Sequence, residues 1–392
     1  MTNESILQAT QTYLMANYGR IPLVTARASG ATVWDATGKQ YLDLFAGFGA
    51  GGLGHCHPKV VAAIGKAAGE MMAVGNLYTW ESQVRLAEAI IRHSFPGKVF
   101  YCHSGAEANE AAIKLARRAG GEGRYKIISF HKCFHGRTLG SLSVTATKAY
   151  QAGFEPMLPG NVCVPFGDLK AVENAIDDQT AGVIVEPIQG EGGVNVPTVE
   201  FMKGLRALCD RHKLTLICDE VWTAPARTGK WFAYQHYGIV PDVMTLAKAI
   251  GGGVPVAACV GREAFGDVLT PGTHGCTLGG NPVCAAAGAA VCQAIEEENL
   301  VDEARRKGER IVQAIKNAAI GRVKEIRGKG LMLGIELDAA PDQAKAVFNA
   351  CLDAGVMINI AQGNVVRLAP PMVITDDELD QGLAVVIDAM KG

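Results

Sequence analysis

The sequence predicts an α/β protein with two parts: a large domain, whose mostly parallel sheet is flanked by helices, and a smaller α/β domain. Three observations support this prediction. Short apolar runs alternate with helical patterns between residues 98 and 260, which is typical of a parallel sheet. Longer helical patterns follow from about 282 to 318, and further strand-like regions close the chain. The 392 residues also exceed one ordinary core, so more than one domain is expected.

The first 72 residues predict an N-terminal arm followed by a helix. Residues 4–18 have a helical pattern, and residues 30–44 alternate like a hairpin around an Ala-Thr-Gly turn. Residues 47–54 are dense in glycine and indicate a loop. Pro58 then opens a helical pattern that runs to Met72, because proline is tolerated in the first turn of a helix.

The predicted strands of the two domains follow this arm. Strands near 322–337 and 364–369 belong to the small domain at the end of the chain. We therefore predict an arm at residues 1–50 that packs with the small domain, a large domain at 51–289, and the small domain at 290–392. The apolar runs that predict the large sheet are residues 98–102, 126–129, 182–186, 214–219, 243–247 and 256–260.

Composition and charge exclude several classes of function. Hydrophobic residues make up 48% and charged residues 19%, as in a compact globular enzyme, and a net charge of −2 gives no support for binding nucleic acid or an anionic membrane. The N-terminus has no signal-peptide pattern, and the small apolar run 283–292 is too short to cross a bilayer, so a soluble protein is expected. The 11 cysteines form no Cys-x-x-Cys pair, which favours the reducing cytoplasm. Segments 55–57 and 131–135 contain His and Cys, but neither has recognised zinc spacing, so no metal is expected.

The strongest chemical signal is an acid and a lysine at the ends of two predicted strands. Asp219 ends the run 214–219, and Lys248 follows the run 243–247. A carboxylate that holds a pyridinium proton and a lysine that forms an imine are what a pyridoxal phosphate site needs. Lys248 lies between apolar residues, where a lysine has a depressed pKa and is nucleophilic as the neutral amine. Taken alone, Asp219 can equally be a cap for the following turn.

A helix that begins after the strand 98–102 offers a place for the phosphate. Ser104 and Glu107 fit a capping box, and the backbone N–H groups of Ser104, Gly105 and Ala106 are free to bind an anion. Capping boxes also open many helices that bind nothing, so this signal is weak by itself.

Two arginines suit the recognition of carboxylates, because a guanidinium fork binds a carboxylate with two parallel hydrogen bonds. They are Arg137, in the segment Phe-His-Gly-Arg-Thr, and Arg367, in Val-Val-Arg-Leu. Either one alone is more simply an ordinary ion pair or a solvated side chain. Their value is collective.

Together these segments resemble the class III, ornithine-type aminotransferases of fold type I, and most closely the acetylornithine aminotransferases. The resemblance covers nearly the whole chain and includes six segments in the family's order: Ser-Gly-Ala-Glu-Ala-Asn-Glu-Ala-Ala (104–112), Phe-His-Gly-Arg-Thr (134–138), Glu-Pro-Ile-Gln-Gly-Glu (186–191), Asp-Glu-Val (219–221), Lys-Ala-Ile-Gly-Gly-Gly (248–253) and Thr-Leu-Gly-Gly-Asn-Pro (277–282).

The resemblance implies a transaminase with bound pyridoxal 5′-phosphate. In that scheme Lys248 forms the imine with the cofactor and moves the proton, Asp219 pairs with the pyridinium nitrogen, and Phe134 stacks on the ring. Thr277 would reach the phosphate bound by the neighbouring subunit, which implies a homodimer. The remaining implied cofactor contacts are Ser104, Gly105, Ala106, Glu186 and Trp222.

The implied substrates are an amine donor and 2-oxoglutarate. N-acetylornithine reacts at its terminal amine, so its distant α-carboxylate would meet Arg137. Glutamate reacts at its α-amine, so its α-carboxylate would meet Arg367 and its side-chain carboxylate Arg137. Glu191 would pair with Arg367 during the first half-reaction and release it during the second. The products would be a semialdehyde and glutamate, in a step of arginine biosynthesis.

The chain departs from the family's pattern at two places near this site. Trp222 stands where the family usually has a glutamine that contacts the phenolic oxygen of the cofactor, and Pro225 restricts the loop that follows. Glycines within 47–54 replace a usual pair of asparagines and can admit a bulkier donor. Ornithine, 4-aminobutyrate and an acylated or carrier-bound lysine therefore stay open as donors.

Other classes of function are compatible with the same residues. An aminomutase or lyase can use the same carbanion chemistry on this scaffold. Arg367 and Glu191 favour a glutamate half-reaction over those alternatives. A protein that binds the cofactor without turnover is a third reading, for which Trp222 is the only indication.

Overall fold

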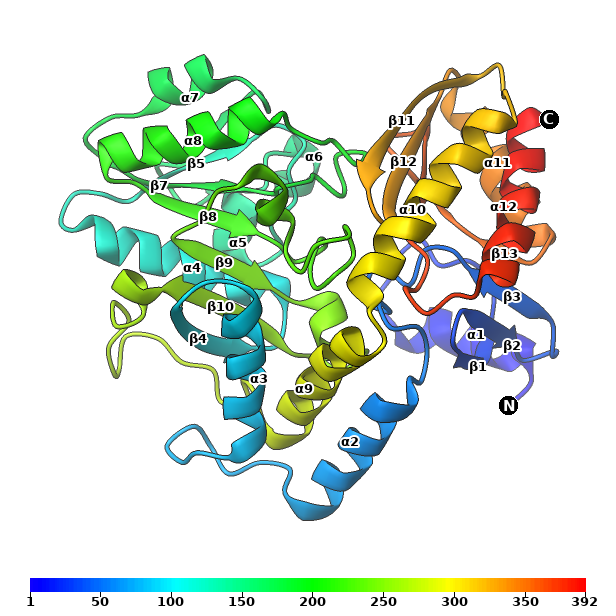
Figure 1. Ribbon diagram of the computed structural model, residues 1–392, viewed down its shortest axis with the longest axis horizontal. Coiled ribbons are helices and arrows are strands. Elements are labelled where there is room, and N and C mark those ends of the chain that lie inside the picture. Colours follow the sequence, from blue (N-terminus) through cyan, green and yellow to red (C-terminus); the bar gives the residue numbers. More distant parts are fainter.

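A seven-stranded sheet is the centre of the larger part of the molecule (Figure 1). The computed structural model describes residues 1–392. The strand order is β4-β10-β9-β8-β7-β5-β6, and only β10 runs antiparallel to its neighbours. The predicted α/β class with a mostly parallel sheet is therefore confirmed. The strands are β4 (Gly97–Cys102), β5 (Lys126–Phe130), β6 (Val162–Val164), β7 (Thr180–Val185), β8 (Thr215–Asp219), β9 (Val243–Leu246) and β10 (Ala257–Arg262).

Helices cover both faces of this sheet, because its central strands are apolar on both sides. On one face, α4 (Gly105–Gly120) packs its small side chains, such as Ala112 and Ala116, against Ile217 of β8. On the other face, α3 (Glu81–His93), α8 (Val199–His212) and α9 (Pro282–Glu297) share a larger core with Leu216 and Cys218 of the same strand. Successive residues of β8 thus point into different cores, as the period of two requires.

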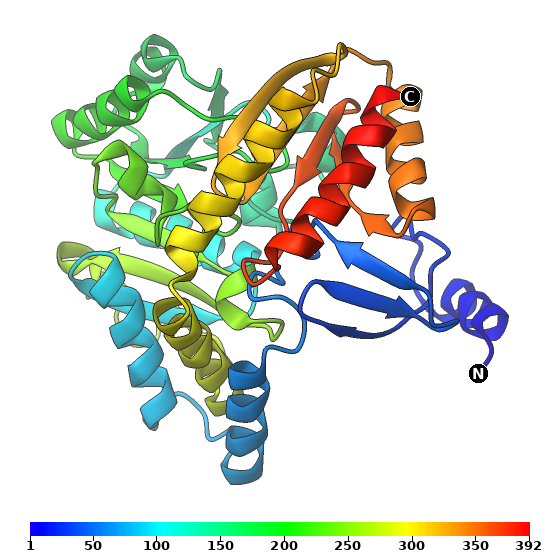
Figure 2. The same ribbon diagram turned by 45° about the vertical axis from the view of Figure 1, so that its right-hand side comes forward.

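The smaller part contains two four-stranded sheets (Figure 2). One is antiparallel, with the order β11-β12-β15-β14. In the other, the N-terminal strands β1, β2 and β3 form a meander, and β3 pairs in parallel with β13. The strands are β1 (Thr25–Ser29), β2 (Thr32–Asp35), β3 (Gln40–Asp43), β11 (Val323–Lys329), β12 (Met332–Leu337), β13 (Val356–Met357), β14 (Asn359–Ala361) and β15 (Val365–Leu368).

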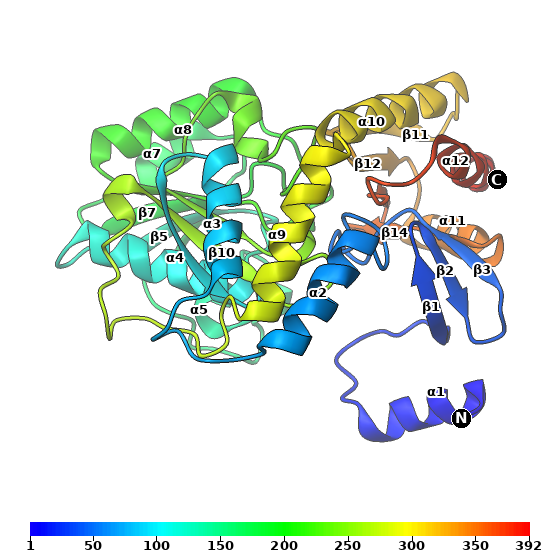
Figure 3. The ribbon, with the colours of Figure 1, turned by 60° about the horizontal axis from the view of Figure 1, so that its bottom comes forward.

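The remaining helices lie around these sheets, and α2 lies beside α9 (Figure 3). They are α1 (Asn3–Tyr13), α2 (Pro58–Glu70), α5 (Leu139–Ser143), α6 (Lys148–Gln151), α7 (Leu169–Ala175), α10 (Leu300–Asn317), α11 (Pro341–Asp353) and α12 (Asp376–Lys391), with 3-10 turns η1 (Ala233–Tyr237), η2 (Lys248–Gly251) and η3 (Glu263–Phe265). No helix combines the length and the hydropathy needed to cross a membrane.

One sequence prediction differs from the structure in detail. The first helix ends at Tyr13 and not near residue 18. The predicted helical patterns from 282 to 318 form two helices, α9 and α10, which are separated by Asn299 with its left-handed backbone conformation of φ +50°. The division into 1–50, 51–289 and 290–392 stays a prediction.

Candidate active site

A cavity of about 460 Å³ opens at the carboxyl ends of the parallel strands, where ligands of α/β sheets bind. All but two of the twelve predicted site residues line it. Those two are Arg367, which lies behind the wall of the cavity, and Thr277. The lining residues from the prediction are Ser104, Gly105, Ala106, Phe134, Arg137, Glu186, Glu191, Asp219, Trp222 and Lys248.

Asp219 is held in place by three donors at the end of β8. Its Oδ2 accepts hydrogen bonds from Asn109 Nδ2 at 2.8 Å and from His135 Nδ1 at 2.7 Å, and its Oδ1 accepts from the Val221 backbone at 3.0 Å. Asp219, Asn109 and His135 are all buried. Fixed donors keep the carboxylate oriented toward the cavity with little freedom to rotate.

His135 and Asn109 are the functional positions that the sequence reasoning missed. Burial disfavours protonation of His135, but neighbouring Cys133 and the Asp219 carboxylate outweigh burial and raise the pKa of His135 well above its ordinary value. The sequence signal for this pair was Asn109 itself, a polar residue between Ala108 and Ala112 on a face of α4 that consists of small apolar residues. A fully buried polar side chain in such a stripe needs a partner.

Lys248 begins the 3-10 turn η2 directly beyond β9. It adopts the left-handed region, with φ +52°, and its Nζ lies 5.6 Å from the centre of the Trp222 ring. Burial lowers the pKa of Lys248 to about 8, against the opposing charges of Glu191 and Asp219. A usable fraction of the amine is therefore neutral and nucleophilic near neutral pH.

The N-terminus of α4 forms the polar end of the cavity. Ser104 and Glu107 complete the predicted capping box, which leaves the N–H groups of Gly105 and Ala106 without partners inside the helix. A Cβ on Gly105 would lie 2.8 Å from Val221 Cγ1, so only glycine allows this close approach. The free N–H groups and the positive end of the helix dipole can bind a phosphate.

Phe134 and Arg137 form another side of the cavity. The Phe134 backbone N–H donates to Glu186 Oε2 at 3.2 Å, and burial raises the pKa of Glu186 to about 7. The Arg137 guanidinium lies 3.8 Å from the centre of the Tyr150 ring and makes no ion pair with any carboxylate of the chain. Since Arg137 is exposed and lines the cavity, it is free to bind the carboxylate of a ligand.

Arg367 is enclosed and is not part of the cavity wall. Its side chain is 2% exposed, pairs with Glu191 Oε1 at 2.9 Å and donates through Nε and Nη2 to Asn359. The guanidinium also lies within 5.1 Å of the centre of the Trp222 ring and 5.2 Å of that of Phe45. A ligand carboxylate can reach Arg367 only if Glu191 gives way.

Trp222 stands between Lys248 and the enclosed arginine. Its indole N–H donates to the backbone carbonyl of Phe48, so the ring is anchored to the N-terminal loop. Gly49 and Gly190 pack against the ring so closely that a Cβ on either would overlap it. Tryptophan has a single donor. Trp222 therefore meets any ligand in this cavity through its apolar ring alone.

Thr277 lies outside the cavity of its own chain. It is exposed, on the loop between β10 and α9. The role of Thr277 toward a second subunit stays a prediction.

The residues of this cavity fit both ends of a pyridoxal phosphate molecule, its phosphate and its pyridine ring. The N-terminus of α4, shaped by Gly105, suits the phosphate, and the oriented Asp219 carboxylate suits a protonated pyridine nitrogen. Lys248 offers an amine of lowered pKa toward the aldehyde. His135 Nε2 is buried without a partner in the chain, which leaves one further donor for a ligand.

Comparison with known proteins agrees with this fit. The model of the family Aminotransferase class-III matches residues 13–390. The chain is similar to the acetylornithine aminotransferase of Caldanaerobacter subterraneus subsp. tengcongensis, with 44% identity over 97% of each chain. It is also similar to that of Mycolicibacterium smegmatis, with 47% identity over 94% of this chain and 93% of the relative.

A solved structure extends the similarity to the whole fold. The ornithine aminotransferase from Toxoplasma gondii ME49 matches with a TM-score of 0.95 and 33% identity, covering 100% of this chain and 95% of that chain. The family model alone spans nearly the full length of the chain. The chain therefore belongs to the class-III aminotransferases, which are pyridoxal-phosphate-dependent enzymes.

Proposed function

We propose that the protein transfers the terminal amino group of N-acetylornithine to 2-oxoglutarate, giving the semialdehyde and glutamate. The observation that carries this proposal is the unequal state of two arginines. Arg137 is unpaired in the cavity, whereas Arg367 is held by Glu191. One carboxylate site is thus always open, and the second opens only when Glu191 releases it.

This arrangement suits two substrates of different shape in one cavity. A donor that reacts at its terminal amine has one carboxylate, far from the reacting carbon, and Arg137 can bind it. Glutamate and 2-oxoglutarate carry a second carboxylate close to the reacting carbon. That carboxylate can displace Glu191 from Arg367, since both are carboxylates that compete for one guanidinium fork.

Lys248 and Asp219 perform the chemistry in this proposal. Bound pyridoxal phosphate supplies an electron-withdrawing ring that accepts charge from the reacting carbon. Asp219, fixed by Asn109 and His135, keeps a positive charge at the ring nitrogen favourable. Lys248 Nζ removes the proton from the carbon that bears the amino group, as a general base with a pKa of about 8.

A donor panel tests the choice of substrate. The holoenzyme should react in single turnover with N-acetylornithine at least about tenfold faster than with ornithine, 4-aminobutyrate or N-acetyl-lysine, because pocket discrimination of this size is typical. The loss of the cofactor's visible absorbance measures each rate. If another donor reacted faster, N-acetylornithine would not be the substrate and that amine would replace it. Ornithine is the first alternative, because the similar Toxoplasma gondii structure is an ornithine aminotransferase.

The same assay separates transfer from the other carbanion chemistries. Addition of 2-oxoglutarate after the donor should restore the absorbance and release one glutamate for each donor consumed. A mutase or a lyase on this scaffold would convert the amine without forming glutamate.

The proposed enzyme is a homodimer in the cytoplasm. Thr277 is exposed on a loop outside its own cavity, a position from which it can reach a second subunit, and all cysteines are free thiols. The mass of the holoenzyme in solution should be twice that of the 41.3 kDa chain. A monomer with full activity would contradict the contribution of Thr277 across an interface. Cell fractionation tests whether the enzyme is in the cytoplasm.

A further inference from the structure

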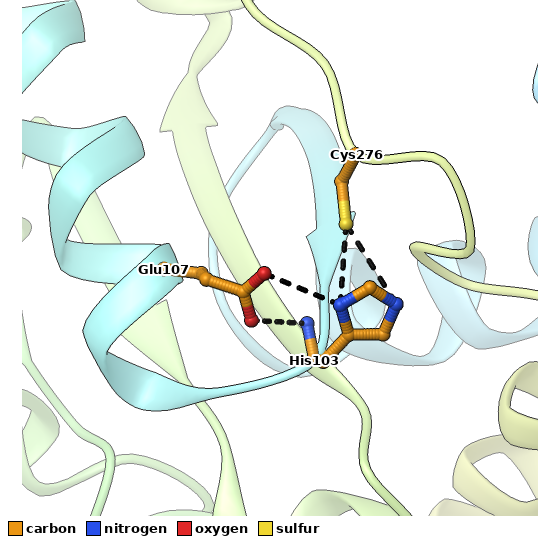
Figure 4. Close-up of side chains that lie close together, drawn as sticks. All are labelled: His103, Glu107 and Cys276. Atoms are coloured by element: carbon orange, nitrogen blue, oxygen red, sulfur yellow. Dashed lines mark hydrogen bonds and ion pairs between the residues drawn. The ribbon is translucent and has the colours of Figure 1, made fainter. Parts of the chain in front are cut away.

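Three potential metal ligands meet beside the phosphate end of the cavity (Figure 4). His103 follows β4, Glu107 lies in the first turn of α4, and Cys276 comes from the loop before α9. His103 Nδ1 lies 3.2 Å from Glu107 Oε1 and 3.3 Å from Cys276 Sγ. All three side chains are partly exposed in the single chain.

The two oxygens of Glu107 have separate tasks. Oε2 accepts hydrogen bonds from the backbone N–H groups of His103 and Ser104 and from the Ser104 hydroxyl, at 2.9–3.2 Å, and so caps α4. Oε1 points away from these donors toward the His103 ring. Capping therefore fixes the carboxylate with one oxygen directed at the other two ligands, as neighbouring hydrogen bonds orient the ligands in metal sites.

We propose that His103, Glu107 and Cys276 bind a thiophilic divalent cation of the Zn²⁺ type. Zn²⁺ takes nitrogen, oxygen and sulfur ligands at about 2.0–2.3 Å in a tetrahedron, so neighbouring ligand atoms lie about 3.3–3.6 Å apart. The observed N···O distance of 3.2 Å and N···S distance of 3.3 Å are slightly shorter than two edges of such a tetrahedron, so small side-chain movements would complete the site. Three protein ligands leave the fourth position to water.

Zn²⁺ binds cysteine as the thiolate, so a bound cation would displace the thiol proton of Cys276 and form a bond to its sulfur.

The ion would join two segments that are far apart in the sequence. Cys276 precedes Thr277, and His103 precedes Ser104 at the start of the α4 phosphate site. A metal bridge between them would hold the loop of Thr277 against the N-terminus of α4. The site therefore has a structural role next to the phosphate and does not require a metal in the transfer reaction.

Titration of the chelator-treated holoenzyme, freed of excess cofactor, tests the site. Zn²⁺ should bind with one equivalent per chain in competition with a chromophoric chelator, and Co²⁺ should give the visible d–d bands of a tetrahedral site. Cys276→Ser and His103→Asn should each weaken Zn²⁺ binding by at least about 100-fold. Cys163→Ser is the matched control, because Cys163 is exposed on β6 and far from these ligands in the sheet order.

A second measurement needs no substitution. Zn²⁺ should protect Cys276 of the wild-type holoenzyme from alkylation, read by peptide mass, while the labelling of Cys163 stays unchanged. No stoichiometric Zn²⁺ binding, or equal affinity and equal Co²⁺ bands in Cys276→Ser, would overturn the proposal and leave a hydrogen-bonded triad only. Unchanged alkylation of Cys276 at saturating Zn²⁺ would also overturn it.

Discussion

Replacing Lys248 with alanine should lower the rate of amino-group transfer by about 10²–10⁴-fold, the usual contribution of a general acid or base. Alanine keeps the Cβ, so the left-handed backbone at this position, φ +52°, carries no new strain. The variant should also lose the covalent attachment of the cofactor, because no other lysine lines the cavity. Steady-state kinetics and the visible absorbance of the purified protein measure the two effects.

Lys203→Ala is the matched control for this substitution. Lys203 is exposed on α8, so its removal should leave both the rate and the absorbance unchanged. Small primary amines added to Lys248→Ala should restore part of the activity, since the cavity is intact and only the amine is missing. A variant that retained wild-type absorbance and rate would contradict the assignment of Lys248.

The sheet was predictable because its strands leave a strong local signal. Buried strands such as β7 and β8 are mostly apolar runs. Strands that alternate with helices along the chain favour parallel pairing. Short strands left no such signal. β13 and β14 have two and three residues, and they are edge strands whose pairing with β3 and β15 depends on tertiary context.

The site was predictable to the extent that its residues lie at strand ends. Asp219 and Lys248 follow neighbouring strands of one sheet, so their convergence in one cavity follows from topology. His103 and Cys276 are 173 positions apart and meet through a loop path. No periodicity or spacing rule fixes the path of such a loop, which explains why the metal expectation from sequence considered only local His and Cys segments.

The burial of Arg367 also could not be predicted from its sequence. The segment around it reads as a strand, but the environment of its side chain depends on Phe45, Trp222 and Asn359 from three other segments. The sequence identified Trp222 as a departure from the family's pattern. Only the structure shows that the indole N–H of Trp222 donates a hydrogen bond to the backbone carbonyl of Phe48. This hydrogen bond holds the Trp222 ring beside Arg367.

Arg367→Ala should slow the half-reaction with glutamate by about 30- to 5,000-fold and leave that with N-acetylornithine within about tenfold of wild type. Removing one partner of a buried, hydrogen-bonded carboxylate contact costs about 2–5 kcal/mol, and each 1.36 kcal/mol is tenfold. Arg137→Ala should instead slow both half-reactions, because Arg137 is the carboxylate site that both substrates use. Single-turnover absorbance changes measure the two halves separately.

The ratio of the two half-reactions within one variant controls for damage to the fold. Loss of the buried Arg367 side chain leaves Asn359 and Glu191 without their partner, but any loss of folded protein would lower the amplitudes of both half-reactions and leave the ratio of their rate constants unchanged. A changed ratio therefore reports carboxylate recognition alone. Equal slowing of both halves in Arg367→Ala would contradict the division of labour between the arginines, because the release of Glu191 would then serve no particular substrate.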